Sequence, residues 1–478
     1  MEPNSIARTS CLERLPLELI RAILCQLNGL TTLRCAILSC HSVLNSFTGS
    51  SSVIATRVLL NELDSCDVRP EAMAALLASR LARPTRSSVH EFYKAHLQKR
   101  NVEVGIRLTL KEVADLSRLH SAVLRLVKDF TEARLQELVA AMKDGHTSQP
   151  QFQSLELSIL ERHRIMRTLY ILEIFFNVFR QTSMPKIELG QCMNDFLFAF
   201  AHWEIEQIAC VQDFLFFQVS PSFNEMAAHD VCWGAFEVEP ARWLGDSYLQ
   251  SLYFKGLVFL ESFAKAKTYD RQLELLYHGR LLDHGQLLDH WQLPHIRPHN
   301  FHRALRDFSY EMRNEEASVS KYENSRDYAL KVKPLYFEDP DDGPFSIWKW
   351  AHESESLGRS VYQRRQAKLR KWGYVMWDQA RLDTLPISRD RWQLPTFSLF
   401  DRSLHDAPVG EVDDSWTFSW RERKQIYKKK GRGWWDFGDE SKIEWTPRVQ
   451  PKDNPEKIHI IPTSLDEAKR VIFALERP

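Results

Sequence analysis

Residues 15–27 read Leu-Pro-Leu-Glu-Leu-Ile-Arg-Ala-Ile-Leu-Cys-Gln-Leu, a leucine-proline pair that opens an amphipathic helix. Pro16 suits the first helical turn, because its missing N–H would have no partner there and its ring already fixes a helical φ angle. Asn28-Gly29 is a typical helix stop. The spacing predicts one apolar stripe and one polar side. The stripe comprises Leu19, Ile20, Ile23, Leu24 and Leu27, and the polar side comprises Glu18, Arg21 and Gln26.

Two further short helices are predicted directly after this one. Their apolar residues are Leu30, Leu33, Ala36, Ile37 and Leu38 in the second helix, and Cys40, Val43, Leu44 and Phe47 in the third. Three helices this short cannot shield all of their apolar faces by packing only against each other. Part of this surface is therefore expected to need a partner.

The pattern over residues 11–55 resembles an F-box, the adaptor-binding module of substrate receptors in ubiquitin ligases. The resemblance implies that this module docks onto a Skp-family adaptor (S-phase kinase-associated protein), which is held by a cullin, while the rest of the chain captures a protein substrate. Many F-boxes carry a tryptophan near the end of the third helix, where this chain has His41, Asn45 and Phe47. The adaptor-binding candidates carried over are Leu15, Pro16, Leu19, Ile20, Ile23, Leu24, Leu27, Leu33, Cys40 and Leu44.

Composition sets limits on the class of protein. The chain has 478 residues, 44% of them hydrophobic, which indicates two or three folded domains. Lys and Arg number 63, as do Asp and Glu, so no overall charge favours nucleic acid or an anionic membrane. No run of 18 apolar residues appears, and the first 20 positions do not resemble a signal peptide. The eight scattered cysteines indicate reduced thiols, so we expect a cytoplasmic or nuclear protein.

The predicted fold is mainly α-helical and has three parts. The F-box-like module at 11–55 is followed by a helical body at 56–338, with a candidate split near 143–153, and by a Trp-rich, loop-rich region at 345–478. A break is expected at 338–344, where prolines and a glycine flank acidic residues. No period of 20 to 50 residues recurs, which excludes leucine-rich, WD-type and kelch repeats. The body is similar to a large group of fungal F-box proteins without assigned substrates.

The spacing of apolar residues predicts individual helices and one short strand. The aromatic residues of 195–219 are expected in the core, and the ten tryptophans from Trp348 to Trp445 favour irregular segments packed by indoles. Helices are expected at 53–63, 69–82, 155–179, 248–263 and 359–372, at two places within 104–142, and at 464–476 after a capping box, with a short strand at 457–461.

Two other clusters of residues are candidate binding sites, one for a metal ion and one for nucleic acid. Six histidines lie between residues 278 and 302, namely His278, His284, His290, His295, His299 and His302. They lack the tight pairs of zinc sites, so ordinary loop histidines are favoured over a metal centre. Residues 421–432 contain seven basic residues flanked by Trp416, Trp420, Trp434 and Trp435. This segment is compatible with single-stranded nucleic acid, but a solvated loop is the favoured interpretation.

No catalytic motif, cofactor fingerprint or metal-ligand pattern is present in the sequence. We therefore predict a substrate receptor that is not an enzyme, with no catalytic, cofactor-binding or metal-binding residue. The alternatives are an interaction or regulatory protein whose F-box-like helices belong to one larger helical domain, and a nucleic-acid-associated protein that uses residues 421–435. An enzyme is a further alternative, which a deep polar pocket lined by titratable groups with perturbed pKa values would favour. Exposure distinguishes the first two, because an adaptor site should leave part of the 15–27 stripe uncovered.

Overall fold

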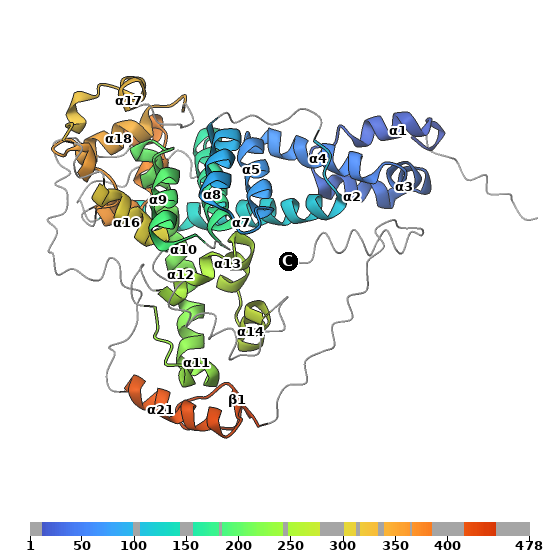
Figure 1. The fold of residues 1–478 in the computed structure, drawn as a ribbon. Coiled ribbons are helices and arrows are strands. Elements are labelled where there is room, and N and C mark those ends of the chain that lie inside the picture. Colours follow the sequence, from blue (N-terminus) through green and yellow to red (C-terminus); the bar gives the residue numbers. More distant parts are fainter. Residues whose placement is uncertain are drawn as a thin grey trace, which may run out of the picture. The chain divides into compact units, whose positions relative to one another are not determined.

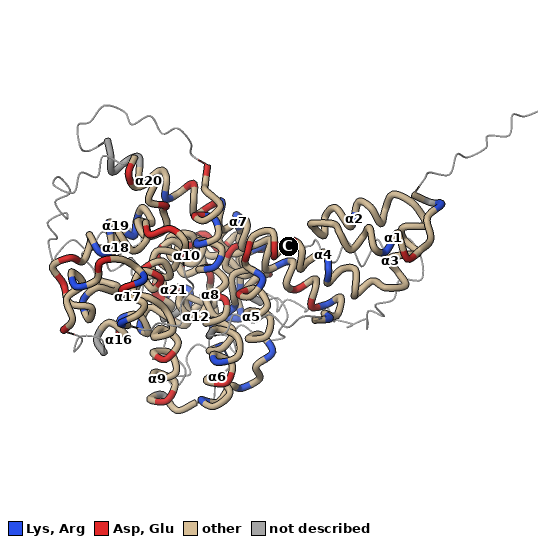
Figure 2. Tube along the Cα trace, turned by 90° about the horizontal axis from the view of Figure 1, so that it is seen from above, with Lys and Arg blue, Asp and Glu red and all other residues tan. Residues whose placement is uncertain are grey.

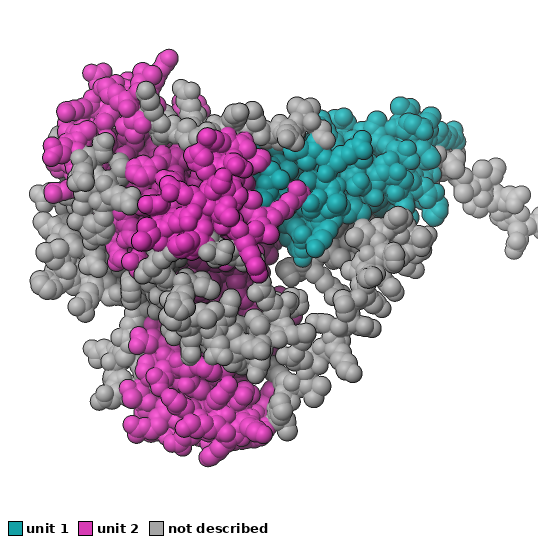
Figure 3. All heavy atoms as spheres, in the orientation of Figure 1, with its two compact units in different colours: residues 1–77, 100–122, 452–478 teal, residues 78–99, 123–451 magenta. Residues whose placement is uncertain are grey.

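The computed structural model describes residues 12–98, 106–143, 156–180, 184–241, 247–277, 301–311, 316–332, 339–363, 366–384 and 415–445. The protein is mainly α-helical, as the sequence predicts (Figure 1). Within these ranges the regular strands are β1 (Arg432–Gly433) and β2 (Ile443–Glu444), which pair antiparallel. Internal contacts divide the chain into two compact units (Figure 3). The first takes in residues 1–77, 100–122 and 452–478, and the second takes in residues 78–99 and 123–451.

The first unit is built on short helices. They are η1 (Leu12–Arg14), α1 (Leu17–Leu24), α2 (Leu30–Ser39), α3 (His41–Thr48) and α4 (Ser51–Ser65), with the first part of α5 (Arg69–Ser79) and of α7 (Leu110–Lys143). Helix α3 packs against both α1 and α2, and α2 also packs against α4. The buried side chains of α1 to α3 are Ile20, Leu24, Leu33, Ile37, Val43, Leu44 and Phe47.

Helix α1 ends earlier than the sequence predicts. It stops at Leu24, because the next residues tighten the turn: the Gln26 N–H donates to the Ile23 carbonyl at 3.0 Å. Asn28-Gly29 then leads into α2 rather than ending α1. Gly29 has extended backbone there, and the Leu33 N–H donates to its carbonyl at 3.1 Å.

The second unit is organised around two long buried helices, α8 (Ile159–Phe179) and α10 (His202–His229), which pack against each other. Both are buried on nearly all sides, so their apolar residues show no single stripe. The aromatic residues of 195–219 lie in the core as predicted, except for Phe198, which is 47% exposed, and Phe217, which is half-buried. Phe175 has ring contacts with Phe179, Phe196 and Phe301 in this core.

Shorter helices surround this pair. They are α6 (Arg86–Phe92), η2 (Tyr93–Gln98), α9 (Lys186–Leu197), α11 (Val231–Ala235), α12 (Ser247–Tyr253), α13 (Leu257–Ala264), α14 (Tyr269–Tyr277), α16 (Phe301–Glu311), η4 (Val319–Lys321), α17 (Ser325–Val332), α18 (Gly343–His352), η5 (Leu357–Arg359), α19 (Ala367–Lys371), η7 (Tyr374–Met376), α20 (Gln379–Thr384) and α21 (Ser415–Lys428). No helix in the described ranges is long and apolar enough to cross a membrane.

In three regions the predicted helices are joined, divided or shortened. The two helices expected within 104–142 are one helix, α7. The helix expected at 248–263 is divided into α12 and α13, because Gly256 adopts φ 91° and the Leu257 N–H is capped by Glu173 at 2.7 Å. The helix expected at 359–372 is reduced to η5 and α19. Residues 360–363 are not helical, and the Ser360 carbonyl accepts a hydrogen bond from Trp348 Nε1 at 3.0 Å. The strand at 457–461 and the helix at 464–476 lie outside the described residues.

Candidate protein-docking site

Helix α1 begins one residue after the start that the leucine-proline pair predicts. Pro16 is its N-cap, with φ −53° and ψ 145°, and the Pro16 carbonyl accepts hydrogen bonds from the N–H groups of Leu19 and Ile20 at 3.0 and 3.2 Å. The helix itself starts at Leu17. Its first turn also carries Glu18, whose negative charge suits the positive end of the helix dipole.

The apolar stripe of α1 is divided into two rows. Ile20 and Leu24, one turn apart, are 1% and 2% exposed and belong to the core of α1 to α3. Leu19 and Ile23, also one turn apart, are 51% and 44% exposed. Exposed Pro16 precedes Leu19 by three positions and extends the outer row by one turn. We call Pro16, Leu19 and Ile23 the α1 face.

The other adaptor-binding candidates occupy different environments. Leu33 and Leu44 are 3% and 5% exposed, so they form the core beneath α1 together with Ile20 and Leu24. Leu15, Leu27 and Cys40 are half-buried. The structure therefore brings only part of the predicted set to the surface of the first unit, and the rest position it.

Polar side chains that sequence reasoning missed fix the turn between α1 and α2. Asn61 of α4 donates from Nδ2 to the carbonyls of Cys25 and Leu27 at 2.9 and 3.0 Å. The Leu30 N–H at the start of α2 donates to Glu62 Oε2 at 3.4 Å. Burial raises the pKa of the Glu62 carboxyl, and the hydrogen bond from Leu30 opposes that rise. These side chains satisfy backbone groups that the ends of both helices leave unpaired.

Arg21 was predicted on the wet side of α1, and this prediction needs correction. Arg21 is half-buried, and its Nε donates to the Ser46 carbonyl of α3 at 3.2 Å. A side chain on Gly49, the residue after α3, would lie 2.6 Å from the Arg21 guanidinium. A polar contact therefore joins α1 to α3 beside the apolar one. Sequence alone gave no signal for it, since arginine on a helix surface is ordinarily solvated.

Few charges surround these helices. Arg34 is the one Lys, Arg, Asp or Glu residue in α2, and α3 has none, as the mostly tan tube in Figure 2 shows. Leu38 on α2 is a further apolar residue with substantial exposure, at 39%. Exposed apolar residues are ordinary when scattered singly. The α1 face differs because its members adjoin each other on one helix.

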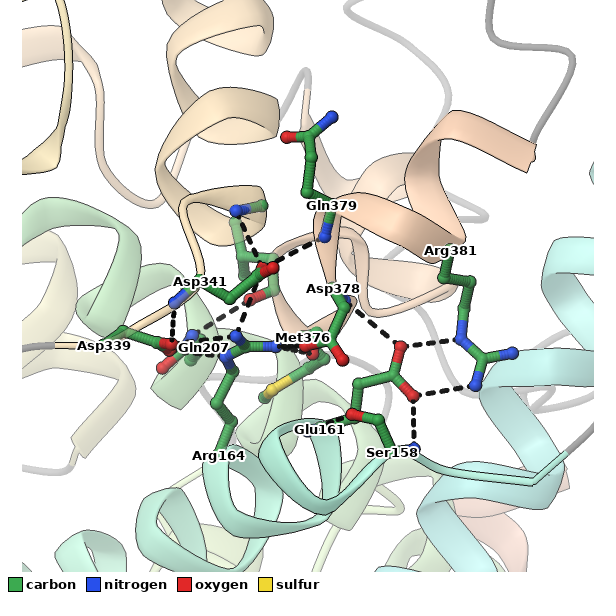
Figure 4. A network of polar contacts seen from close by, with 12 residues as sticks. Ser158, Glu161, Arg164, Gln207, Asp339, Asp341, Met376, Asp378, Gln379 and Arg381 are labelled. Atoms are coloured by element: carbon green, nitrogen blue, oxygen red, sulfur yellow. Dashed lines mark hydrogen bonds and ion pairs between the residues drawn. The ribbon is translucent and has the colours of Figure 1, made fainter.

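The densest charged cluster lies in the second unit and contains Arg164 of α8 (Figure 4). Arg164 is 4% exposed and pairs with the carboxylates of Asp339, Asp341 and Asp378. Its Nη1 also donates to the Met376 carbonyl at 3.2 Å. Arg164 therefore joins α8 to the segment before α18 and to the segment before α20.

Glu161, one turn earlier on α8, is also paired on all sides and contacts the segment that contains Asp378 and Arg381. Its carboxylate accepts from the backbone N–H groups of Ser158 and Asp378 at 3.0 and 3.1 Å, and pairs with Arg381 at 2.7 Å. Although burial alone would raise the pKa of Glu161, these hydrogen bonds hold it below its usual range. A carboxylate kept ionised and fully paired is a structural group rather than a general acid or base.

The basic segment at 421–432 is partly removed from solvent. Arg423 is fully buried and donates to the carbonyls of Ala227 and Asp230 at 2.7 and 3.0 Å. Burial lowers its pKa to about 10. The exposed cations are Arg421, Lys424, Lys428, Lys429 and Lys430, and Lys424 pairs with Glu237 at 3.1 Å.

The histidine cluster lies outside the described residues except for His302, whose Nδ1 is 2.7 Å from the Tyr362 hydroxyl. In the part of the chain that the structure describes, no group of three or more His, Cys, Asp or Glu residues is arranged to hold a metal ion.

No protein-family model, curated protein or solved structure matches this chain. Its function is therefore argued from its own residues and geometry.

Proposed function

We propose that this chain is the substrate-recognition subunit of a Skp-cullin-F-box type ubiquitin ligase. In this proposal the α1 face binds a Skp-family adaptor, and through it a cullin. The second unit binds a protein substrate, and the chain itself catalyses no step. The cysteine pattern favours action in the cytoplasm or nucleus.

The observation that supports the proposal most is the exposure of Leu19 and Ile23 beside the buried pair Ile20 and Leu24. A helix of an ordinary helical domain is expected to cover both rows with later parts of the same domain. Among the described residues one row remains uncovered, on a helix that is attached to α3 through Arg21 and to α4 just after its last residue. A fixed backbone that presents apolar side chains suits binding, because little conformational entropy is lost when a partner docks.

The contribution of Leu19 and Ile23 to the free energy of adaptor binding can be calculated from their exposed fractions. Fully burying a Leu or Ile side chain contributes about 1.5–3 kcal/mol. Leu19 and Ile23 keep 51% and 44% of their surface exposed, so covering the remainder contributes about 1 kcal/mol at each position. Loss of both side chains should weaken adaptor binding by about 2 kcal/mol, or roughly 30-fold.

The test measures the affinity of purified full-length protein for a purified Skp-family adaptor by isothermal titration calorimetry. The test variant is the double substitution Leu19→Ala and Ile23→Ala. The matched control is Ile187→Ala with Leu330→Ala, since these are also exposed apolar helix residues, at 79% and 70%, and both belong to the second unit. The proposal expects a loss of about 30-fold in the test variant and none in the control.

Two results would overturn the proposal. One is the absence of measurable adaptor binding by the unsubstituted protein. The other is an equal loss of affinity in both double variants, since this would show that the α1 face has no special part in binding.

A further inference from the structure

The second unit contains a pocket of about 370 Å³ where the β1–β2 hairpin meets α10 and α14. It is lined by Glu225 from the last turn of α10, by Tyr269 and Asp270 from the first turn of α14, and by Gly433, Trp434, Lys442 and Glu444 from the hairpin. This volume lies at the small end of the range for ligand sites, about 300–1,000 Å³. It suits one side chain or a small molecule better than a nucleotide.

One wall of the pocket is aromatic. The indole of Trp434 stacks on His229, with ring centroids 4.0 Å apart and an angle of 8° between the planes. His229 covers one face of the indole, and Trp434 is itself part of the pocket lining. Tyr269 meets the same indole edge-on, at 5.4 Å and 75°. The negative face of an indole attracts cations, which are held best when the ring is fixed in place.

The rest of the lining has an excess of negative charge. It has three carboxylates, those of Glu225, Asp270 and Glu444, and one ammonium, that of Lys442. The Lys442 Nζ itself lies over the Trp434 ring, 5.9 Å from its centroid. The pocket therefore already attracts one cation from its own chain, at a distance that leaves the interaction weak.

The walls are fixed by hydrogen bonds on each side. The Trp435 N–H donates to the His229 carbonyl at 2.9 Å, which attaches the hairpin to the end of α10. The Tyr269 hydroxyl donates to Asp230 Oδ2 at 2.7 Å, and Gln272 Nε2 donates to Glu225 Oε2 at 3.0 Å. These contacts hold the phenol and one carboxylate in place, so a ligand need not order them.

We propose that this pocket binds an ammonium or guanidinium group of side-chain size. The aromatic wall and the excess of carboxylates both favour a cation, and the volume limits its size. Lys442 competes for the same place, so its removal should improve binding. The source of the cation is either a Lys or Arg side chain of a bound polypeptide or a free amine. The proposal is independent of the adaptor, because every lining residue belongs to the second unit.

The test measures the affinity of the full-length protein for small probes by isothermal titration calorimetry at low ionic strength. N-acetyl-lysine methylamide and N-acetyl-arginine methylamide represent the side chains, butylamine represents a free amine, and N-acetyl-norleucine methylamide is the uncharged control. Cationic probes should bind saturably and the norleucine probe should not. Tighter binding of the amino-acid amides than of butylamine supports a polypeptide source, and equal binding supports a free amine.

Charge variants make the test specific to this pocket. Glu225→Gln retains an oxygen that can accept from Gln272 and should weaken cation binding about two- to fivefold. Lys442→Ala should tighten it by a similar factor. Lys428→Ala, which removes another exposed lysine, should leave it unchanged.

The proposal fails if the norleucine probe binds as well as the cations. It also fails if Lys442→Ala and Lys428→Ala alter binding equally, since both remove one positive charge and only Lys442 lines the pocket. Binding that survives 0.5 M NaCl without loss would overturn it as well, because salt screens the attraction between partly exposed charges.

Discussion

The two rows of α1 should respond differently to the same kind of truncation. Ile20 and Leu24 are almost completely buried, so replacing either with alanine removes core contacts and leaves a cavity. Such changes cost about 2–5 kcal/mol of stability. Leu19 and Ile23 are about half exposed. Their replacement should cost about 1 kcal/mol or less, because much of each side chain is already in water.

Hydrogen exchange measured by mass spectrometry can follow this difference within the full-length chain. Peptides from residues 17–48 report the opening of α1 to α3 without interference from the second unit. Ile20→Ala should lower protection there by at least about 30-fold, the equivalent of 2 kcal/mol. Leu19→Ala should lower it by about fivefold or less.

A large loss of protection in Leu19→Ala, equal to that in Ile20→Ala, would refute the reasoning. It would mean that Leu19 is covered by the chain itself and is not available to a partner. Ile23→Ala and Leu24→Ala form a second pair of exposed and buried positions. If both pairs differ in protection in the same way, the difference is not specific to one position.

Three further outcomes are expected. Asn61→Ala should destabilise the first unit by about 1–3 kcal/mol in urea unfolding, because two partly buried carbonyls lose their donor. Gly256→Ala should lower the unfolding temperature, since φ 91° disfavours a Cβ atom and that atom would lie 2.8 Å from Glu173 Oε1. Burial lowers the pKa of His202 to about 3, so the unfolded state binds the proton between pH 6.5 and 3. Stability should therefore fall by about 2 kcal/mol from pH 7 to pH 5 through this residue, and His202→Gln should reduce that loss in urea titrations at both pH values.

The helical class and the start of α1 could be predicted because both depend on local chemistry. A proline at the start of a helix and an apolar period of 3.6 are visible within a dozen residues, although Pro16 is the N-cap rather than part of the first turn. The first and last residues of the buried helices are harder to predict from the sequence. Helix α10 is enclosed on nearly all sides and shows no polar stripe, and the division at Gly256 depends on Glu173, which is far away in sequence.

The long-range polar contacts could not be predicted from spacing. Asn61 reaches carbonyls 34 and 36 residues earlier, and Arg164 pairs with carboxylates 175 to 214 residues later. The pocket is assembled from α10, α14 and the hairpin, and no motif connects these three segments. Asparagine, arginine and glutamate are common on helix surfaces, so their residue type alone does not show which of them have a buried partner.

The α1 stripe shows where prediction from periodicity ends. Adjacent residues on a helix are 100° apart, so a stripe of five apolar residues is wider than one contact with a neighbouring helix. Ile20 and Leu24 take that contact, and Leu19 and Ile23 are turned away from it. The packing of α3 and the Arg21 contact with Ser46 determine which row faces inward. The apolar pattern of α1 contains no information about either contact. The same side chains cannot both form the core and bind a partner. The inner row therefore determines stability, and the outer row is the part of the stripe that we propose binds an adaptor.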